Sequence, residues 1–162
     1  MRWRVNQRAR FSCACPTVVS IQSRTTALPP LPPVDHVLAN PPWHDPAATR
    51  PPDARRAAAT HRGAGGLAAW IDALAPLANA TLTLILPATL QGEATARLQA
   101  THLATLTIHP LWPREGRPAK IIIIQAAPGR SQIHTAPGLV LHKEGQGYTP
   151  QTEAILRNGS TM

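Results

Sequence analysis

The chain has 162 residues, 43% of them hydrophobic, so it is large enough to bury one core and is expected to form a single domain. It has no run near the roughly 20 apolar residues that span a membrane, and its basic start is not followed by the apolar stretch of a signal peptide. We therefore expect a cytoplasmic protein with no membrane partner. The net charge of +8 indicates a polyanionic partner such as RNA, although an arginine-rich composition from a biased genome would give the same charge.

Metal-ligating residues are sparse. Cys13 and Cys15 are too close for an ordinary disulfide framework and have no second Cys or His cluster at metal-ligand spacing. We interpret them as free thiols in a reducing compartment. The histidines are scattered singly, so no metal site is expected.

Residues 1–33 form an irregular segment, with a possible strand at Thr17–Ile21 and a proline cluster at Leu28–Pro33. The organised part of the chain is expected to be residues 34–162. It begins with Val34–Ala39, a short apolar run that predicts a buried strand.

Asn40-Pro41-Pro42-Trp43 follows this strand directly, where ligands bind in open α/β sheets. The prolines restrict the backbone, so the Asn40 side chain and the Pro41 carbonyl are held ready to accept hydrogen bonds from an amine. Such contacts favour the pyramidal, nucleophilic form of an exocyclic NH2 group. Trp43 offers a flat face on which a base can stack. The alternative is a proline-stiffened surface turn in which Trp43 only packs.

The segment His44–Gly66 is rich in Pro, Ala, Arg and Gly, and a loop of this length is usually a functional lid or is disordered. Arg55 and Arg56, with Arg50 and Arg62, are candidates to contact RNA phosphates, and a plain solvated loop is the alternative.

Helices and strands alternate after this loop. Apolar residues at helical spacing predict a helix that ends near Pro76; they are Leu67, Trp70, Ile71, Leu74 and Leu77. We expect a strand at Thr81–Leu86, a weaker helix at Gln91–Ala100 and a strand at Thr105–Leu111. The uninterrupted Ile121–Ile124 predicts a strand covered on both faces.

The connection Pro113–Lys120 is basic, and Arg114, Arg117 and Lys120 are predicted to bind RNA. Near the end of the chain, Thr149 as N-cap and Pro150 at the first helical position start a short helix that Gly159 closes.

The sequence resembles a known family in several places. The string DHVLANPPWHDP is similar to the fourth strand and catalytic loop, (N/D)PP(Y/F/W), of S-adenosylmethionine-dependent methyltransferases acting on planar nitrogen. Over Val34 to about Gly159 the chain resembles the C-terminal half of bacterial tRNA adenine-N6 methyltransferases of the small methyltransferase domain type, in the strings TLTLILP, LTIHPLWPREGRPAKIIIIQA and LVLHKEGQGYTPQTEAILRNG.

The resemblance implies an α/β fold: the latter half of a Rossmann-like class I methyltransferase sheet, with the final strand inserted antiparallel. It implies S-adenosyl-L-methionine as cofactor and methyl transfer to adenine N6 in tRNA, with Asn40, Pro41, Pro42 and Trp43 as catalytic residues. Guanine N2 in rRNA and a protein glutamine are alternative acceptors for the same motif. A non-catalytic RNA-binding remnant is the alternative from another class.

The glycine-rich turn that approaches the cofactor in this family has no counterpart before Val34, and Gly63–Gly66 follows no strand. Residues 1–33 are too short for the missing strand and helix units. We therefore expect a truncated or misassigned gene start, with Asn40 as only a partial cofactor site. One face and one edge of the sheet should then lie uncovered, and the chain alone should bind the cofactor weakly.

Overall fold

The computed structural model describes residues 31–42 and 66–160. The strand expected at Thr17–Ile21, Trp43, and the segment from His44 to Gly65 with its arginines lie outside the described residues. The described residues begin shortly before the first strand of the predicted organised part of the chain.

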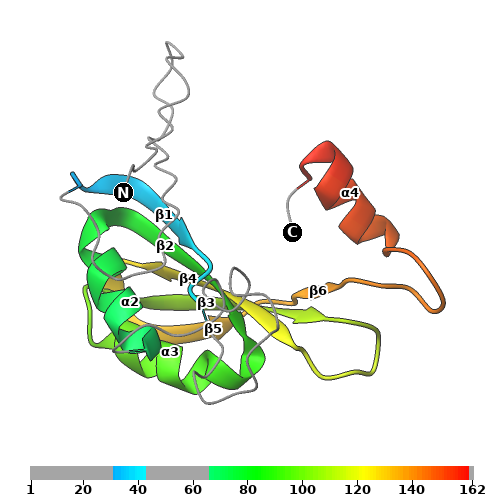
Figure 1. The fold of residues 1–162 in the computed structure, drawn as a ribbon, viewed down its shortest axis with the longest axis horizontal. Coiled ribbons are helices and arrows are strands. Elements are labelled where there is room, and N and C mark those ends of the chain that lie inside the picture. The colour runs from blue at the N-terminus through cyan, green and yellow to red at the C-terminus, as the bar shows by residue number, and fades with distance from the viewer. Residues whose placement is uncertain (1–30, 43–65, 161–162) are drawn as a thin grey trace, which may run out of the picture.

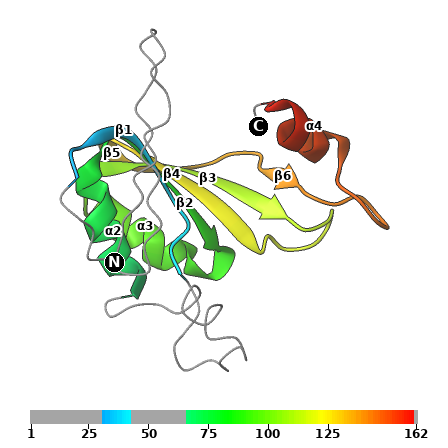
Figure 2. The same ribbon diagram turned by 45° about the horizontal axis from the view of Figure 1, so that its top comes forward.

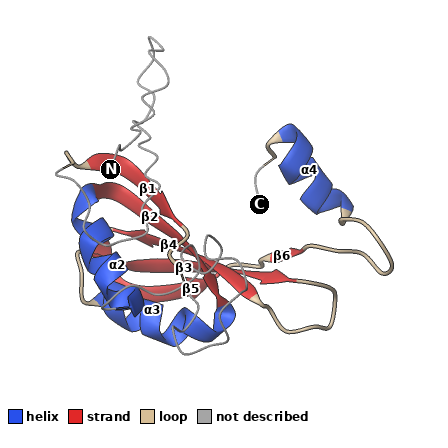
Figure 3. Cartoon of the chain, in the orientation of Figure 1, coloured by secondary structure: helices blue, strands red, loops and turns tan. Residues whose placement is uncertain are grey.

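Strands and helices alternate through the first part of the described chain, as predicted (Figures 1 and 3). The elements are β1 (Val34–Ala39), α2 (Gly66–Leu74), the 3-10 turn η1 (Ala75–Leu77), β2 (Ala78–Pro87), the 3-10 turn η2 (Ala88–Leu90), α3 (Gln91–Gln99), β3 (Leu103–Trp112), β4 (Ile121–Ala127), β5 (Gly129–Thr135), β6 (Leu139–Val140) and α4 (Pro150–Asn158). None of the described helices is long and apolar enough to cross a membrane.

The described strands form one six-stranded sheet in the order β1-β2-β4-β3-β5, and β6 pairs with the end of β3. β1 and β2 are parallel. β4 lies between β2 and β3 and is antiparallel to both, which confirms the predicted insertion of the final strand of the expected order. Its Ile124 pairs with Leu84 on one side and Ile108 on the other.

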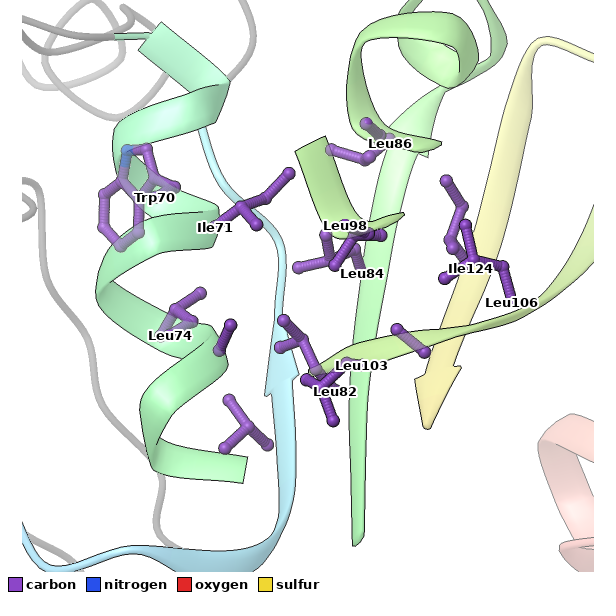
Figure 4. Packing of buried hydrophobic residues seen from close by; sticks show 14 of the residues in the cluster. Trp70, Ile71, Leu74, Leu82, Leu84, Leu86, Leu98, Leu103, Leu106 and Ile124 are labelled. Carbon is purple, nitrogen blue, oxygen red and sulfur yellow. The ribbon is translucent and has the colours of Figure 1, made fainter. Parts of the chain in front are cut away.

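Helices α2 and α3 lie side by side on the same face of the sheet (Figure 2). They cover the alternate residues of β2, β3 and β4 that are fully buried, so the core lies between these helices and this face (Figure 4). Four of the five residues predicted to form the core side of this helix are buried in α2, namely Leu67, Trp70, Ile71 and Leu74. The fifth, Leu77, lies beyond α2 in the turn η1 and is partly buried against the core. In the described part of the chain, the fold therefore has two layers, the helices and the sheet, with the core between them.

The prediction that Ile121–Ile124 is covered on both faces is wrong for the described residues. Ile122 and Ile124 are buried beneath the helices, whereas Ile121 is 41% exposed and Ile123 is half-buried. Neighbouring residues of a strand face opposite sides of the sheet, and both covering helices lie on one side. Leu38, on the opposite face of edge strand β1, is 68% exposed. Among the described strands, β1 has a neighbour on one edge only.

Strands β5 and β6 were not predicted. Every residue of β5 is exposed, so it shows no apolar alternation, and β6 has only two residues. β5 reaches the outer edge of β3 because Gly129, at φ 149°, passes close to Thr105. A Cβ at Gly129 would clash with the Thr105 hydroxyl, so only glycine fits this crossing.

The C-terminal helix α4 begins and ends as predicted. The Thr149 hydroxyl accepts a hydrogen bond from the Thr152 backbone N–H at 3.2 Å, and Gly159 adopts the left-handed conformation that closes the helix. The Thr149 and Thr152 hydroxyls also donate to the Val140 carbonyl, at 2.8 and 3.1 Å. These bonds hold the start of α4 against β6.

We predict that Leu84→Ala lowers the free energy of unfolding by about 2–5 kcal/mol, because it leaves a cavity in a fully buried position. The matched control, Leu38→Ala, removes an exposed side chain and should change it by less than about 0.5 kcal/mol. Urea unfolding followed by circular dichroism measures both. Similar losses in the two variants would contradict the one-sided core.

Candidate functional site

The carboxyl ends of the parallel strands β1 and β2 lie at one edge of the sheet, and the candidate site is built there. The antiparallel β4 starts at the same edge, where the Ala88 backbone N–H donates to the Lys120 carbonyl at 2.9 Å. The segment after β1, the end of β2 and the connection before β4 therefore face the same side of the molecule.

Asn40, Pro41 and Pro42 come directly after β1, as predicted. Pro41 is fully buried and Pro42 is buried, whereas Asn40 is exposed. The structure shows no hydrogen bond from the Asn40 side chain to another described residue. The two prolines thus anchor the loop in the protein, while the Asn40 side chain is exposed at the surface. Trp43, the fourth residue of the motif, lies outside the described residues.

The predicted basic residues of the β3–β4 connection lie at this edge of the sheet, beyond β3. Arg114, Arg117 and Lys120 are all exposed. The Arg114 guanidinium donates from Nη2 to the Gly145 carbonyl at 3.1 Å, and the Arg117 N–H donates to the Arg114 carbonyl at 3.2 Å, which closes a turn. Arg55 and Arg56 lie outside the described residues. Whether any of these residues binds RNA stays a prediction.

A stacked aromatic pair lies beside this connection and was not singled out from the sequence. The rings of His142 and Tyr148 are 5.0 Å apart at their centroids and inclined by 21°. The two residues form an isolated antiparallel bridge that closes a turn containing Gly145 and Gly147. The available sequence signal was the glycine-rich turn with an aromatic residue just before the Thr149 N-cap.

An ion pair joins the two covering helices away from this edge. Asp72 of α2 and Arg97 of α3 form a two-pronged ion pair, with Nε–Oδ1 and Nη2–Oδ2 distances of 2.6 and 2.5 Å. Hydrogen bonding and the negative charge of Asp72 raise the pKa of Arg97 above its usual value. Within residues 31–42 and 66–160, no three His, Cys, Asp or Glu side chains gather as metal ligands.

No model of a known protein family matches the chain, and a comparison with curated protein sequences finds no match. The fold is similar to the crystal structure of a predicted O-methyltransferase from Agrobacterium tumefaciens, with a TM-score of 0.52 and 24% identity over 61% of this chain. The chain has a Rossmann-like α/β fold with an open sheet. The match covers 49% of the other protein, so this chain spans about half its length. At this identity the similarity extends to the fold alone.

We predict that Asn40→Ala leaves the free energy of unfolding within about 0.5 kcal/mol of the parent, because the side chain is exposed and makes no bond to the described residues. Pro41→Ala should cost about 1 kcal/mol, since it frees the unfolded backbone and removes buried contacts. Chemical denaturation of both variants tests this. A large loss of unfolding free energy in Asn40→Ala would show that the Asn40 side chain stabilises the fold.

Proposed function

We propose that this chain carries the substrate-binding side of an S-adenosylmethionine-dependent methyltransferase that modifies an exocyclic amino nitrogen of a nucleic-acid base, namely adenine N6 in tRNA. The observation that carries the proposal is the placement of Asn40-Pro41-Pro42. This segment follows a strand of a parallel pair, its prolines are buried, and its asparagine is exposed. The fold similarity to a predicted methyltransferase supports it.

The Asn40-Pro41 pair indicates which kind of atom receives the methyl group. An amino group has two hydrogens, and the Asn40 side-chain oxygen and the Pro41 carbonyl oxygen are two acceptors in adjacent residues. Binding both hydrogens favours the pyramidal nitrogen, whose lone pair is no longer delocalised into the ring. A hydroxyl acceptor has only one hydrogen and would leave one of these oxygens unused. The two hydrogen-bond acceptors therefore favour a nitrogen over an oxygen as the atom that receives the methyl group.

The cofactor is assigned through the same residue. When bound, S-adenosylmethionine supplies an electrophilic methyl group. The Asn40 amide fits a contact to this cofactor, because it is exposed at the ligand-binding edge and forms no hydrogen bond to another described residue. No other described residue is assigned to the cofactor.

The positive charge of the chain and the access that a base needs to Asn40 both favour RNA as the substrate. The chain has a net charge of +8, and its β3–β4 connection presents exposed basic side chains at the edge where Asn40 lies. A base inside a duplex cannot reach Asn40, so the substrate base must be unpaired or flipped out of its stack. A tRNA loop meets this requirement.

We predict that Asn40→Ala lowers turnover by about 10²–10³-fold, or roughly 2.7–4 kcal/mol, the cost of losing one contact that stabilises a transition state. The measurement is N6-methyladenosine formed in tRNA by a full-length protein, quantified by mass spectrometry. Asn79→Ala is the matched control, because Asn79 is an exposed asparagine at the start of β2. Activity of Asn40→Ala within tenfold of the parent would remove Asn40 from the site.

We expect Trp43→Phe to keep more activity than Trp43→Ala in the same assay, because a stacking face is required and either ring provides one. Equal effects of the two changes would assign Trp43 to packing.

Calorimetry with S-adenosylmethionine on the full-length protein used in the turnover assay separates the two classes of function. Binding of the cofactor supports the methyltransferase. RNA binding by that protein without any cofactor binding would support the non-catalytic RNA-binding protein instead. Methylation of guanine N2 or of a protein glutamine would keep the reaction and change the acceptor.

A further inference from the structure

Two loops meet beyond the ends of β3 and β6, residues 113–120 and residues 141–148. The Leu141 N–H donates to the Trp112 carbonyl at 2.8 Å, and the His142 N–H donates to the Pro113 carbonyl at 3.1 Å. The bond from Arg114 to the Gly145 carbonyl joins the loops further out. Both loops project beyond the sheet at the same end (Figures 1 and 2). They therefore form one surface, which we call the paired-loop surface.

An aromatic side chain is exposed on the paired-loop surface. Tyr148 is 44% exposed although its ring stacks against His142, which is half-buried. The bridge between His142 and Tyr148 fixes the backbone at both ends of the turn. A tyrosine held in this way loses little conformational entropy when a further planar group stacks on it.

The paired-loop surface has an excess of basic side chains. Four exposed cationic residues of the paired-loop surface outnumber the two exposed acidic residues, Glu115 and Glu144; the cations are Arg114, Arg117, Lys120 and Lys143. A Cβ at Gly147 would lie 3.2 Å from Cε of Lys143, so the lysine side chain reaches across the turn to Gly147, the residue before Tyr148. A cationic side chain and an exposed aromatic ring thus belong to the same turn.

We infer that the paired-loop surface binds single-stranded RNA, with a base stacked on Tyr148 and neighbouring phosphates contacted by Lys143 and Arg117. Stacking on aromatic side chains combined with cationic contacts to the backbone is how proteins bind single strands. This inference rests on the proposed function for the choice of RNA. An acidic protein would satisfy the cations, whereas in a single strand every base has a face that can stack on the exposed ring beside the phosphates.

The position of the surface indicates which part of the RNA it binds. Three strand spacings of about 4.8 Å separate β1 from β3, so the surface lies about 14 Å across the sheet from the strand that carries Asn40. It is too far away to hold the base that Asn40 binds. It would hold nucleotides that flank the modified one.

The test measures binding of fluorescently labelled oligoadenylate RNA to the full chain by anisotropy, over a series of salt concentrations. Tyr148→Ala and Tyr148→Leu should each weaken binding about 30-fold, the middle of the range for one stacking side chain, with the salt slope unchanged. Tyr148→Phe should bind like the parent. Leucine keeps the apolar volume and lacks the ring, so it separates stacking from simple burial.

The cationic variants have a different expected signature. Lys143→Ala and Arg117→Ala should each reduce the slope of log affinity against log salt by about 0.7, the value for one phosphate contact on a single strand. Ile133→Ala is the matched control, because Ile133 is 49% exposed on β5 and lies outside both loops. It should bind like the parent. Thermal unfolding of every variant checks that the fold is kept.

Two results would overturn the inference: binding of Tyr148→Leu equal to that of the parent, or displacement of the RNA by polyglutamate as effectively as by unlabelled oligoadenylate. Different results would contradict the proposed function. Loss of RNA binding in Tyr148→Leu, together with no methyl transfer by the full-length protein used in the turnover assay, would keep this surface and reject the enzyme. Methyl transfer that depends on Asn40, with RNA binding indifferent to Tyr148, would keep the enzyme and reject this surface.

Discussion

The antiparallel insertion of β4 between β2 and β3 determines which strand ends lie together and how the buried face of the sheet is completed. Because β4 runs against both neighbours, the carboxyl ends of β1, β2 and β3 all fall at the edge where β4 begins. Ile122 and Ile124 of β4 also complete the buried face between Leu84 and Ile108. One strand thus supplies the centre of the core and gathers the Asn-Pro-Pro segment and the basic connection on one side.

The two parts of this edge differ in how they are built. Asn40 is held by its covalent neighbours, since buried prolines fix the backbone on its C-terminal side. The paired-loop surface is held by hydrogen bonds between segments far apart in sequence, such as the bond from Arg114 to Gly145. The backbone at Asn40 is restricted by the residues that follow it in the sequence. The paired-loop surface forms only when β6 has paired with β3, because this pairing brings its two loops together.

This difference explains which parts of the structure could be predicted from the sequence and which could not. The apolar run Val34–Ala39 and the prolines after it locate the Asn40 segment, and the capping residues Thr149 and Gly159 define α4, because each signal is local. The strand β5 has no apolar alternation and depends on the close approach of Gly129 to Thr105, which only the folded chain shows. The exposed Ile121 was mispredicted for a related reason: strand composition does not tell which face a helix covers. The His142–Tyr148 stack likewise needs the turn to be closed.

The edge position of β1 has a kinetic consequence. β3 and β4 are consecutive strands, so their pairing closes a short loop, whereas β1 pairs with β2 only after residues 40–77 have been enclosed. Loop-closure entropy rises with the length of the loop, so β1 should join the sheet after the β3–β4 hairpin has formed. With a described neighbour on one edge only, it should also be among the first strands to detach in local opening. Detachment of β1 would carry the Asn40 segment away from the sheet and would withdraw Val34 and Val37 from the core, while the pairing of β3 with β4 is kept.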